Sequence, residues 1–120
     1  MAAQQRLICA ASALVNGGRG VRFSVTRSGK PLPAFAVRHG GCVYAYVNAC
    51  AHVGVELDWQ EGEFFESSGL YLICATHGAL YAPADGRCIE GPCRGKRLQA
   101  VGVVERDGGI YLKQDEEDHG

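Results

Sequence analysis

The chain has 120 residues, and its 12 basic and 13 acidic side chains give a formal net charge of -1. This length corresponds to one domain with enough residues to bury a hydrophobic core. The charges are mixed along most of the sequence rather than gathered in a basic stripe, which argues against nucleic acid and anionic membranes as partners.

The N-terminal part predicts short strands separated by turns. Arg6 to Cys9 predicts a first strand, and one helical turn is expected at Ser12 to Val15. Residues Val21 to Thr26 alternate between apolar and polar side chains, which is typical of a strand with one buried face. Ser28 to Pro31 contains the residue types that favour a turn.

Two further pairs of strands are predicted as hairpins. Phe35 to Arg38 and Val43 to Val47 are separated by a glycine-containing turn. Ala100 to Glu105 and Ile110 to Lys113 flank an Asp-Gly-Gly turn in the same way. No stretch of ten or more residues has uninterrupted helical spacing of apolar side chains, so we expect an all-β protein.

A long segment between these hairpins is richer in Gly, Cys, His and Pro than the rest of the chain. Long loops in compact domains are usually functional. We therefore predict one domain over 1–120, with an antiparallel β scaffold at about 1–48 and 99–114, an inserted subdomain at about 49–98 and an acidic tail at 115–120. The insert contains one more hairpin candidate, Phe64-Phe65 with Leu70 to Ile73.

The apolar run Leu7 to Val15 is too short to span a bilayer, which takes about 20 residues. It has the length of a signal-peptide core, but only Arg6 precedes it, and the small residues of a cleavage site lie inside the run. We therefore predict a cytoplasmic protein without a membrane partner. Most of its six cysteines are expected to stay reduced unless metal binds them.

Two short boxes carry metal-ligand side chains: Cys50-Ala51-His52-Val53-Gly54 and Cys74-Ala75-Thr76-His77-Gly78. Each box offers one thiolate and one imidazole, so the candidate ligands are Cys50, His52, Cys74 and His77. Tetrahedral zinc accepts this ligand set, and so does an iron-sulfur cluster. Zinc fingers usually group Cys with Cys and His with His, whereas this chain alternates them, which favours the cluster.

The pattern Cys-X-His followed by Cys-X-X-His-Gly resembles the signature of Rieske proteins. The likeness continues through His77 to Tyr81, the Asp85-Gly86 turn and Glu90-Gly91-Pro92. Over nearly its whole length the chain is similar to soluble Rieske-type ferredoxins. The resemblance implies the Rieske fold and one 2Fe-2S cluster, with both cysteines on one iron, both histidines on the other, and Gly91-Pro92 in a loop that covers the cluster.

Some positions differ from the high-potential Rieske proteins of cytochrome bc complexes. Those relatives have a disulfide where this chain has Val55 and Thr76, and a serine where it has Ala79, although Tyr81 matches their tyrosine. Fewer hydrogen bonds to the cluster imply a lower potential, as in ferredoxins that serve oxygenases. The gap between the boxes is also longer than usual, which affects Asp58 to Glu66 rather than the ligands.

The sequence contains no nucleophile with a base, no paired catalytic carboxylates and no nucleotide-binding glycine loop. We therefore predict a monomeric carrier of single electrons between redox protein partners, from a reductase to a terminal oxygenase or similar enzyme. The alternatives are a Rieske-type small subunit of a complex such as NAD(P)H nitrite reductase, and a zinc-stabilised interaction module.

The remaining cysteines have less specific surroundings. Cys88 and Cys93 bracket the predicted covering loop and are compatible with a disulfide, further ligands or buried thiols, of which free thiols are favoured in a reducing compartment. Cys9 and Cys42 lie in strand patterns and are expected in the core.

Aromatic and basic residues inside the insert have two kinds of role. Trp59, Phe64 and Phe65 are expected to pack the inserted hairpin against the scaffold. Four basic residues flank the predicted covering loop: Arg87, Arg94, Lys96 and Arg97. They are either an ordinary solvated surface or a docking site for an acidic redox partner.

Overall fold

The computed structural model describes residues 6–50, 56–58, 60–75, 78–91 and 94–113, and in them the protein is all-β, as predicted. The described strands are β1 (Arg6–Ala10), β2 (Val21–Arg27), β3 (Lys30–His39), β4 (Cys42–Val47), β5 (Leu72–Ile73), β6 (Leu80–Tyr81), β7 (Cys88–Glu90), β8 (Val103–Arg106) and β9 (Gly109–Leu112). The 3-10 turn η1 (Ala11–Ala13) follows β1, close to the predicted helical turn. No helix within the described ranges has the length and apolar character needed to cross a membrane.

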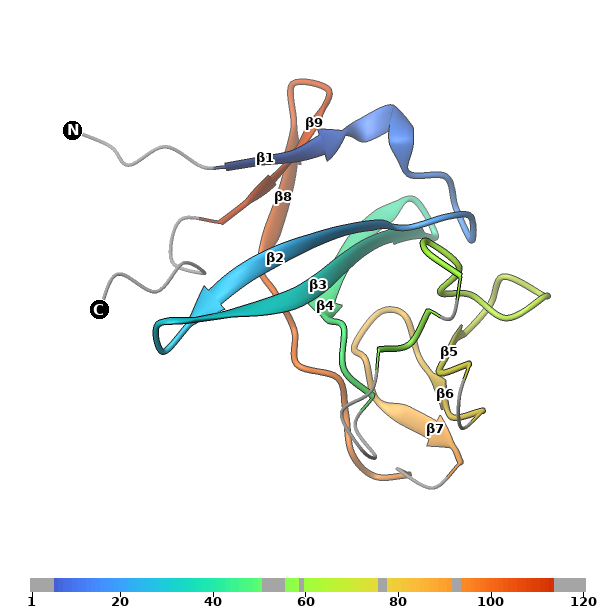
Figure 1. The fold of residues 1–120 in the computed structure, drawn as a ribbon. Coiled ribbons are helices and arrows are strands. Elements are labelled where there is room, and N and C mark those ends of the chain that lie inside the picture. Colours follow the sequence, from blue (N-terminus) through green and yellow to red (C-terminus); the bar gives the residue numbers. More distant parts are fainter. Residues whose placement is uncertain (1–5, 51–55, 59, 76–77, 92–93, 114–120) are drawn as a thin grey trace.

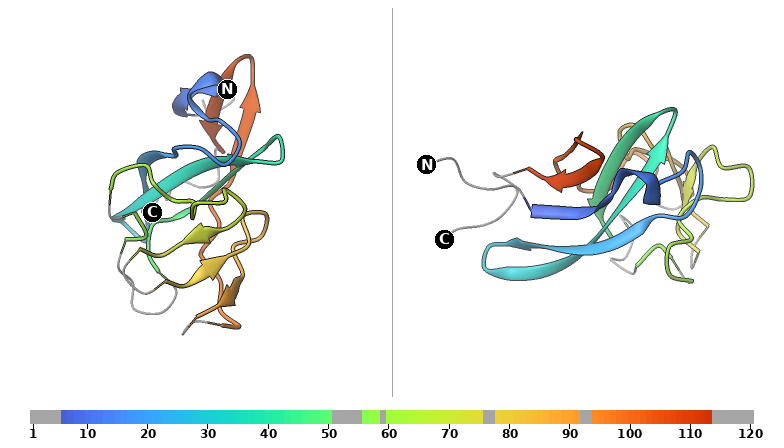
Figure 2. Two further views of the ribbon diagram at one scale, coloured as in Figure 1. Left: turned by 90° about the vertical axis from the view of Figure 1, so that its right-hand side faces the viewer. Right: turned by 90° about the horizontal axis from the view of Figure 1, so that it is seen from above.

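These strands form three antiparallel sheets of three strands each, in the orders β1-β9-β8, β2-β3-β4 and β5-β6-β7. The β2-β3-β4 sheet lies in the middle of the molecule, with β1, β8 and β9 above it and β5, β6 and β7 below it (Figure 1). The same order is visible after a quarter turn about the vertical axis (Figure 2, left). The two hairpins predicted around β3-β4 and β8-β9 are confirmed.

Strand β3 is longer than predicted because it begins before its two prolines. The predicted turn at Ser28 to Pro31 is confined to Ser28 and Gly29, which have positive φ angles of 54° and 75°. Pro31 and Pro33 pair with β2, whereas the pairing of β3 with β4 begins only at Ala34. Proline is tolerated there because this part of β3 lies outside the ladder with β4. The bond made beyond the ladder uses the Pro33 carbonyl, which accepts from the Asn48 N–H at 2.8 Å and needs no proline N–H.

The middle sheet has two buried faces, which the alternation of side chains along β3 and β4 separates. The lower face carries Phe35, Val37 and Tyr46, which pack with residues around β5 and β6. The upper face carries Ala34, Ala36, Ala45 and Val47, which pack with β9 and the segment after η1. We call these two groups the lower and the upper cluster. The larger side chains thus face the sheet whose strands β5 and β6 flank the second ligand box.

Aromatic stacking fixes the inserted hairpin to the lower face. The rings of Phe35 and Phe64 stack with their centroids 4.0 Å apart and an interplanar angle of 12°. Phe65 pairs with Leu72, and the Ile73 N–H donates to the Phe64 carbonyl at 2.9 Å. The predicted hairpin and the packing role of Phe64 are confirmed, whereas Trp59 lies outside the described residues. Tyr46 anchors a different part of the insert, the segment between β6 and β7, because its buried hydroxyl donates to the Pro83 carbonyl at 2.5 Å.

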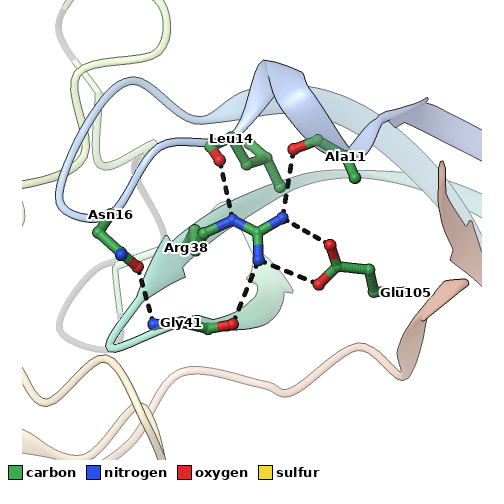
Figure 3. Close-up of polar contacts among 6 residues, drawn as sticks. All are labelled: Ala11, Leu14, Asn16, Arg38, Gly41 and Glu105. Carbon is green, nitrogen blue, oxygen red and sulfur yellow. Dashed lines mark hydrogen bonds and ion pairs between the residues drawn. The ribbon is translucent and has the colours of Figure 1, made fainter. Parts of the chain in front are cut away.

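Arg38 connects the middle sheet to the upper sheet (Figure 3). Its guanidinium donates to the carbonyls of Leu14 and Ala11, and it forms an ion pair with Glu105 of β8 at 2.9 Å. The hydrogen bond from Arg38 keeps the pKa of the Glu105 carboxyl below its usual value. At the adjacent turn, the Gly41 N–H donates to the Asn16 side chain at 2.8 Å.

The two cysteines expected in the core differ. Cys9 in β1 is partly buried and packs against the upper cluster. Cys42 is exposed, so that prediction is wrong. The reason is its position: Cys42 is the first residue of β4, directly after the tight turn at Gly40 and Gly41, where the strand extends beyond the layers that cover the rest of the sheet.

Candidate metal centre

The first cysteine of the predicted ligand set lies just beyond the end of β4. The Cys50 side chain is buried, and its sulfur lies 3.1 Å from the hydroxyl oxygen of Tyr81 in β6. A thiolate can only accept a hydrogen bond, so the Tyr81 hydroxyl is the donor whenever Cys50 is deprotonated. The structure thus brings a fixed hydrogen-bond donor to one of the candidate ligands.

The second cysteine begins a tight turn after β5. The Cys74 N–H donates to the Ala79 carbonyl at 2.9 Å, and the Gly78 N–H donates back to the Cys74 carbonyl at 2.7 Å. Gly78 has a φ of +72°, a conformation that favours glycine. Cys74 is completely buried and belongs to the same lower cluster as Cys50 and Tyr81. Two of the four predicted ligands are therefore brought into one buried region.

A buried asparagine closes the segment that carries the first box. Asn48 precedes the box and Leu57 follows it, and the Leu57 N–H donates to the Asn48 side-chain oxygen at 2.8 Å. The Asn48 side-chain nitrogen donates to the Asp58 carboxylate at 3.0 Å. Asn48 is completely buried, so both bonds are shielded from water. These bonds hold the two ends of the first box segment together.

The same junction connects the two boxes with each other. The Leu57 carbonyl accepts a hydrogen bond from the N–H of Ala75, the residue after Cys74, at 3.0 Å. Leu57 is itself completely buried, and its backbone is thus bonded to Asn48 on one side and to the second box on the other. A shift of Leu57 would move both cysteine-bearing segments relative to each other.

Asp58 anchors this junction to the middle sheet. Its other carboxylate oxygen accepts from the Gly62 N–H at 3.0 Å and lies 3.5 Å from the Arg22 guanidinium of β2. Arg22 also forms an ion pair with Glu56 at 2.5 Å. The buried carboxylate is therefore compensated by an amide, a backbone N–H and a cation, which is the condition for keeping a charge inside a protein.

The segment predicted to cover the site packs against the second box. Gly91 has a φ of +111°, and a Cβ at this position would lie 2.9 Å from the Cα of Ala79. No other residue fits so close to the turn that begins at Cys74. The Arg94 N–H donates to the Gly91 carbonyl at 3.2 Å, which closes the turn. Cys88 of β7 is buried beside this turn, and its sulfur donates to the Glu90 carbonyl at 3.4 Å.

Several predicted positions lie outside the described residues: His52, His77, Val55, Thr76, Pro92 and Cys93. Within the ranges that the structure describes, no group of three or more His, Cys, Asp or Glu is arranged around a metal position. The ligand roles of the four candidate residues and the free thiols favoured at Cys88 and Cys93 remain predictions. Elsewhere, the His39 ring stacks on Phe65 with the ring centroids 6.1 Å apart.

The sequence reasoning missed Asn48 and Asp58. The available signal was their position, since Asn48 directly follows an apolar strand and Asp58 lies four residues after the first ligand box. Polar residues in such positions are common in exposed loops, so burial had to be seen before their role was apparent.

Comparison with known protein families decides what kind of site this is. The family described as "Rieske [2Fe-2S] domain" matches residues 4–107. The chain belongs to this family. A Rieske domain holds one 2Fe-2S cluster, which settles the choice between the cluster and zinc that the ligand types left open.

Solved structures show the same fold at low identity. The ferredoxin of carbazole 1,9a-dioxygenase from Nocardioides aromaticivorans IC177 is 23% identical, with a TM-score of 0.68 over 92% of this chain and 97% of that chain. The Sphingomonas yanoikuyae B1 ferredoxin is 19% identical, with a TM-score of 0.69 over 92% and 99%. The N. aromaticivorans terminal oxygenase is 23% identical, with a TM-score of 0.70 over 98% and only 32%. No curated protein matches the chain.

The residues of the Rieske domain described here fit the cluster. Buried, closely packed cysteines suit a cofactor that needs thiolate ligands and limited access to water. The Tyr81 hydroxyl beside Cys50 supplies a hydrogen bond of the kind that tunes such clusters, and the close contact of Gly91 with Ala79 shields the second box.

Proposed function

We propose that this chain is a one-electron carrier whose 2Fe-2S cluster is held by Cys50, His52, Cys74 and His77. The observation that carries the proposal is the joint burial of Cys50 and Cys74 in the lower cluster of a Rieske domain, with Tyr81 hydrogen-bonded to Cys50. When bound, the cluster takes up and releases one electron at a potential that its imidazole ligands raise above that of an all-thiolate cluster.

The residues around the ligands have separate tasks in this proposal. Cys50 and Cys74 bind one iron from buried positions, so that water is kept from the metal. Tyr81 donates a hydrogen bond to the Cys50 sulfur and disperses part of its negative charge. Ala79 is completely buried and has no hydroxyl to offer a second such bond. The potential should therefore lie below that of the Rieske proteins that have a serine at this position.

The partners follow from the kind of proteins that share the fold. Two of the solved structures are ferredoxins, one of them from carbazole 1,9a-dioxygenase. We infer that this chain receives an electron from a reductase and passes it to a terminal oxygenase or a similar enzyme. A carrier exchanges partners and purifies as a monomer. Constant co-purification with a large chain in equal amounts would instead identify a permanent subunit, as in nitrite reductase.

The cofactor is the first thing to measure. We expect the purified protein to be red-brown, to contain two irons and two acid-labile sulfides per chain, and to be reduced by one electron. Electron paramagnetic resonance of the reduced protein should show the low average g value of Rieske centres, because nitrogen ligands are bound to one iron. A colourless protein with one zinc per chain would contradict the proposal.

Tyr81 provides a test of how the potential is set. Tyr81→Phe removes the hydroxyl that lies 3.1 Å from the Cys50 sulfur but keeps the buried ring in place. Without this hydrogen bond the sulfur keeps more negative charge, so the oxidised form is favoured and the potential falls. Protein-film voltammetry measures the change. The conservative control is Tyr71→Phe, because residue Tyr71 is 38% exposed and is not part of the lower cluster.

A further inference from the structure

Four basic residues lie together on the surface beside the candidate metal centre. Arg87 and Arg97 face each other across an antiparallel bridge, and the Cys88 N–H donates to the Lys96 carbonyl at 2.8 Å. Arg94 belongs to the turn that Gly91 closes. All four side chains are exposed. We call Arg87, Arg94, Lys96 and Arg97 the basic rim.

The rim differs from most of the arginines elsewhere in the protein, because its members lack counter-charges among the described residues. Elsewhere, four arginines form ion pairs with carboxylates: Arg19 with Glu63, Arg22 with Glu56, Arg38 with Glu105 and Arg106 with Asp107. No member of the rim forms an ion pair with a carboxylate of any residue that the structure describes. The nearby Asp85 carboxylate accepts from the Arg87 backbone N–H instead. A net positive surface therefore remains on a chain whose total charge is slightly negative.

The rim adjoins the site through β7. Cys88, next to Arg87, pairs with Tyr81, whose hydroxyl lies against the Cys50 sulfur. Gly91, in the turn of Arg94, lies close to Ala79, the residue after the second box, so that a Cβ at Gly91 would be 2.9 Å from the Ala79 Cα. In Figure 1, β7 lies at the lower end of the molecule, on the side of β5 and β6. Because electron transfer weakens steeply with distance, a partner has to bind at this end of the molecule.

We propose that the basic rim is the docking site for a redox protein whose own surface around its redox centre is acidic. This inference rests on the proposed electron-carrier function. Opposite charges steer such short-lived complexes and raise their rate of association, and ionic strength weakens the effect. A protein fits better than nucleic acid, because the segment 87–97 contains Glu90 and has no aromatic side chain on which a base would stack.

Two electron acceptors of opposite charge provide the test. The reduced protein is mixed in a stopped-flow instrument with plastocyanin, an acidic copper protein, or with cytochrome c, a basic haem protein. One electron leaves the reduced protein and converts copper(II) to copper(I), or iron(III) of the haem to iron(II). We expect the ratio of the plastocyanin rate to the cytochrome c rate to be about tenfold higher at low salt than at high salt.

The variant Arg87→Glu with Arg97→Glu should remove this preference, while the potential of the protein stays unchanged. The matched control is Lys30→Glu with Arg106→Glu, which alters the net charge by the same amount. Lys30 begins β3 beside the β2-β3 turn, and Arg106 ends β8 beside the β8-β9 turn. Both residues are exposed, and both turns lie away from β7 in Figure 1. The control pair should keep the preference for plastocyanin.

The outcomes separate the rim from the carrier function. Reduction of neither acceptor at any salt concentration would overturn the carrier function itself. If both acceptors were reduced with the same salt dependence in the rim variant and in the control variant, the docking proposal alone would be overturned. Binding to phosphatidylserine vesicles is measured as well. If the wild type bound the vesicles through the basic rim, and the rates of acceptor reduction did not depend on the rim, the rim would be a membrane-binding surface. The docking proposal would then be wrong.

Discussion

Replacing Cys50 or Cys74 by serine should abolish cluster binding, so that iron falls from two atoms per chain to a trace and the visible absorbance disappears. Both side chains are buried, and a serine hydroxyl is a poor ligand for iron at neutral pH. The same loss is expected for His52→Ala and His77→Ala, because each leaves an iron open to solvent. Iron and sulfide analysis after anaerobic purification is the measurement.

Other cysteines of the chain are the matched controls for this loss. Cys42 is exposed and Cys9 is partly buried away from the boxes, so Cys42→Ser and Cys9→Ser should keep both irons. Cys88 is the stricter control, since it is buried in the same lower cluster as the two candidate ligands. If Cys88→Ser lost iron as completely as Cys50→Ser, the ligand assignment would be wrong.

The ligand boxes could be recognised from the sequence because their information is local. Each box holds its thiolate, imidazole and glycine within five residues, and few classes of metal site alternate Cys with His in this way. The hairpins around β3-β4 and β8-β9 were predictable for the same reason, since the glycines that form their turns adjoin the strands they connect.

What the sequence did not predict depends on contacts between distant segments. The extension of β3 through Pro31 and Pro33 depends on the position at which its ladder with β4 stops, at Ala34. The exposure of Cys42 depends on how far the hairpin projects beyond the layers around it. Asn48 and Asp58 are ten positions apart, and no periodicity or turn signal indicates that their side chains meet in the interior.

Loss of the contact between Asn48 and Asp58 should lower both the stability of the fold and the retention of the cluster. Asn48→Leu would leave the Leu57 N–H and one Asp58 carboxylate oxygen buried without these partners. An unsatisfied buried group costs about 1 to 3 kcal/mol and a charged one more, so the free energy of unfolding should fall by about 3 kcal/mol. Because the Asn48 bonds hold the first box against the second, the cluster should also be released faster.

Exchanging the two residues tests this coupling. Asn48→Asp alone places two carboxylates in contact and should shorten the half-time of cluster bleaching at neutral pH by about tenfold, since a clash of this size is worth about 1.4 kcal/mol or more. Adding Asp58→Asn restores an amide opposite a carboxylate, so the double variant should recover most of the half-time, although Arg22 then loses part of its counter-charge.

Asn16→Ala is the matched control, because Asn16 accepts a backbone N–H at the same distance, 2.8 Å, but in the scaffold at Gly41. It should lower the unfolding midpoint while leaving the bleaching rate of the folded protein unchanged. Two results would show that Asn48 stabilises the fold without positioning the ligand boxes. One is faster bleaching in Asn16→Ala, in proportion to the stability that this variant loses. The other is a double variant that does not recover the half-time.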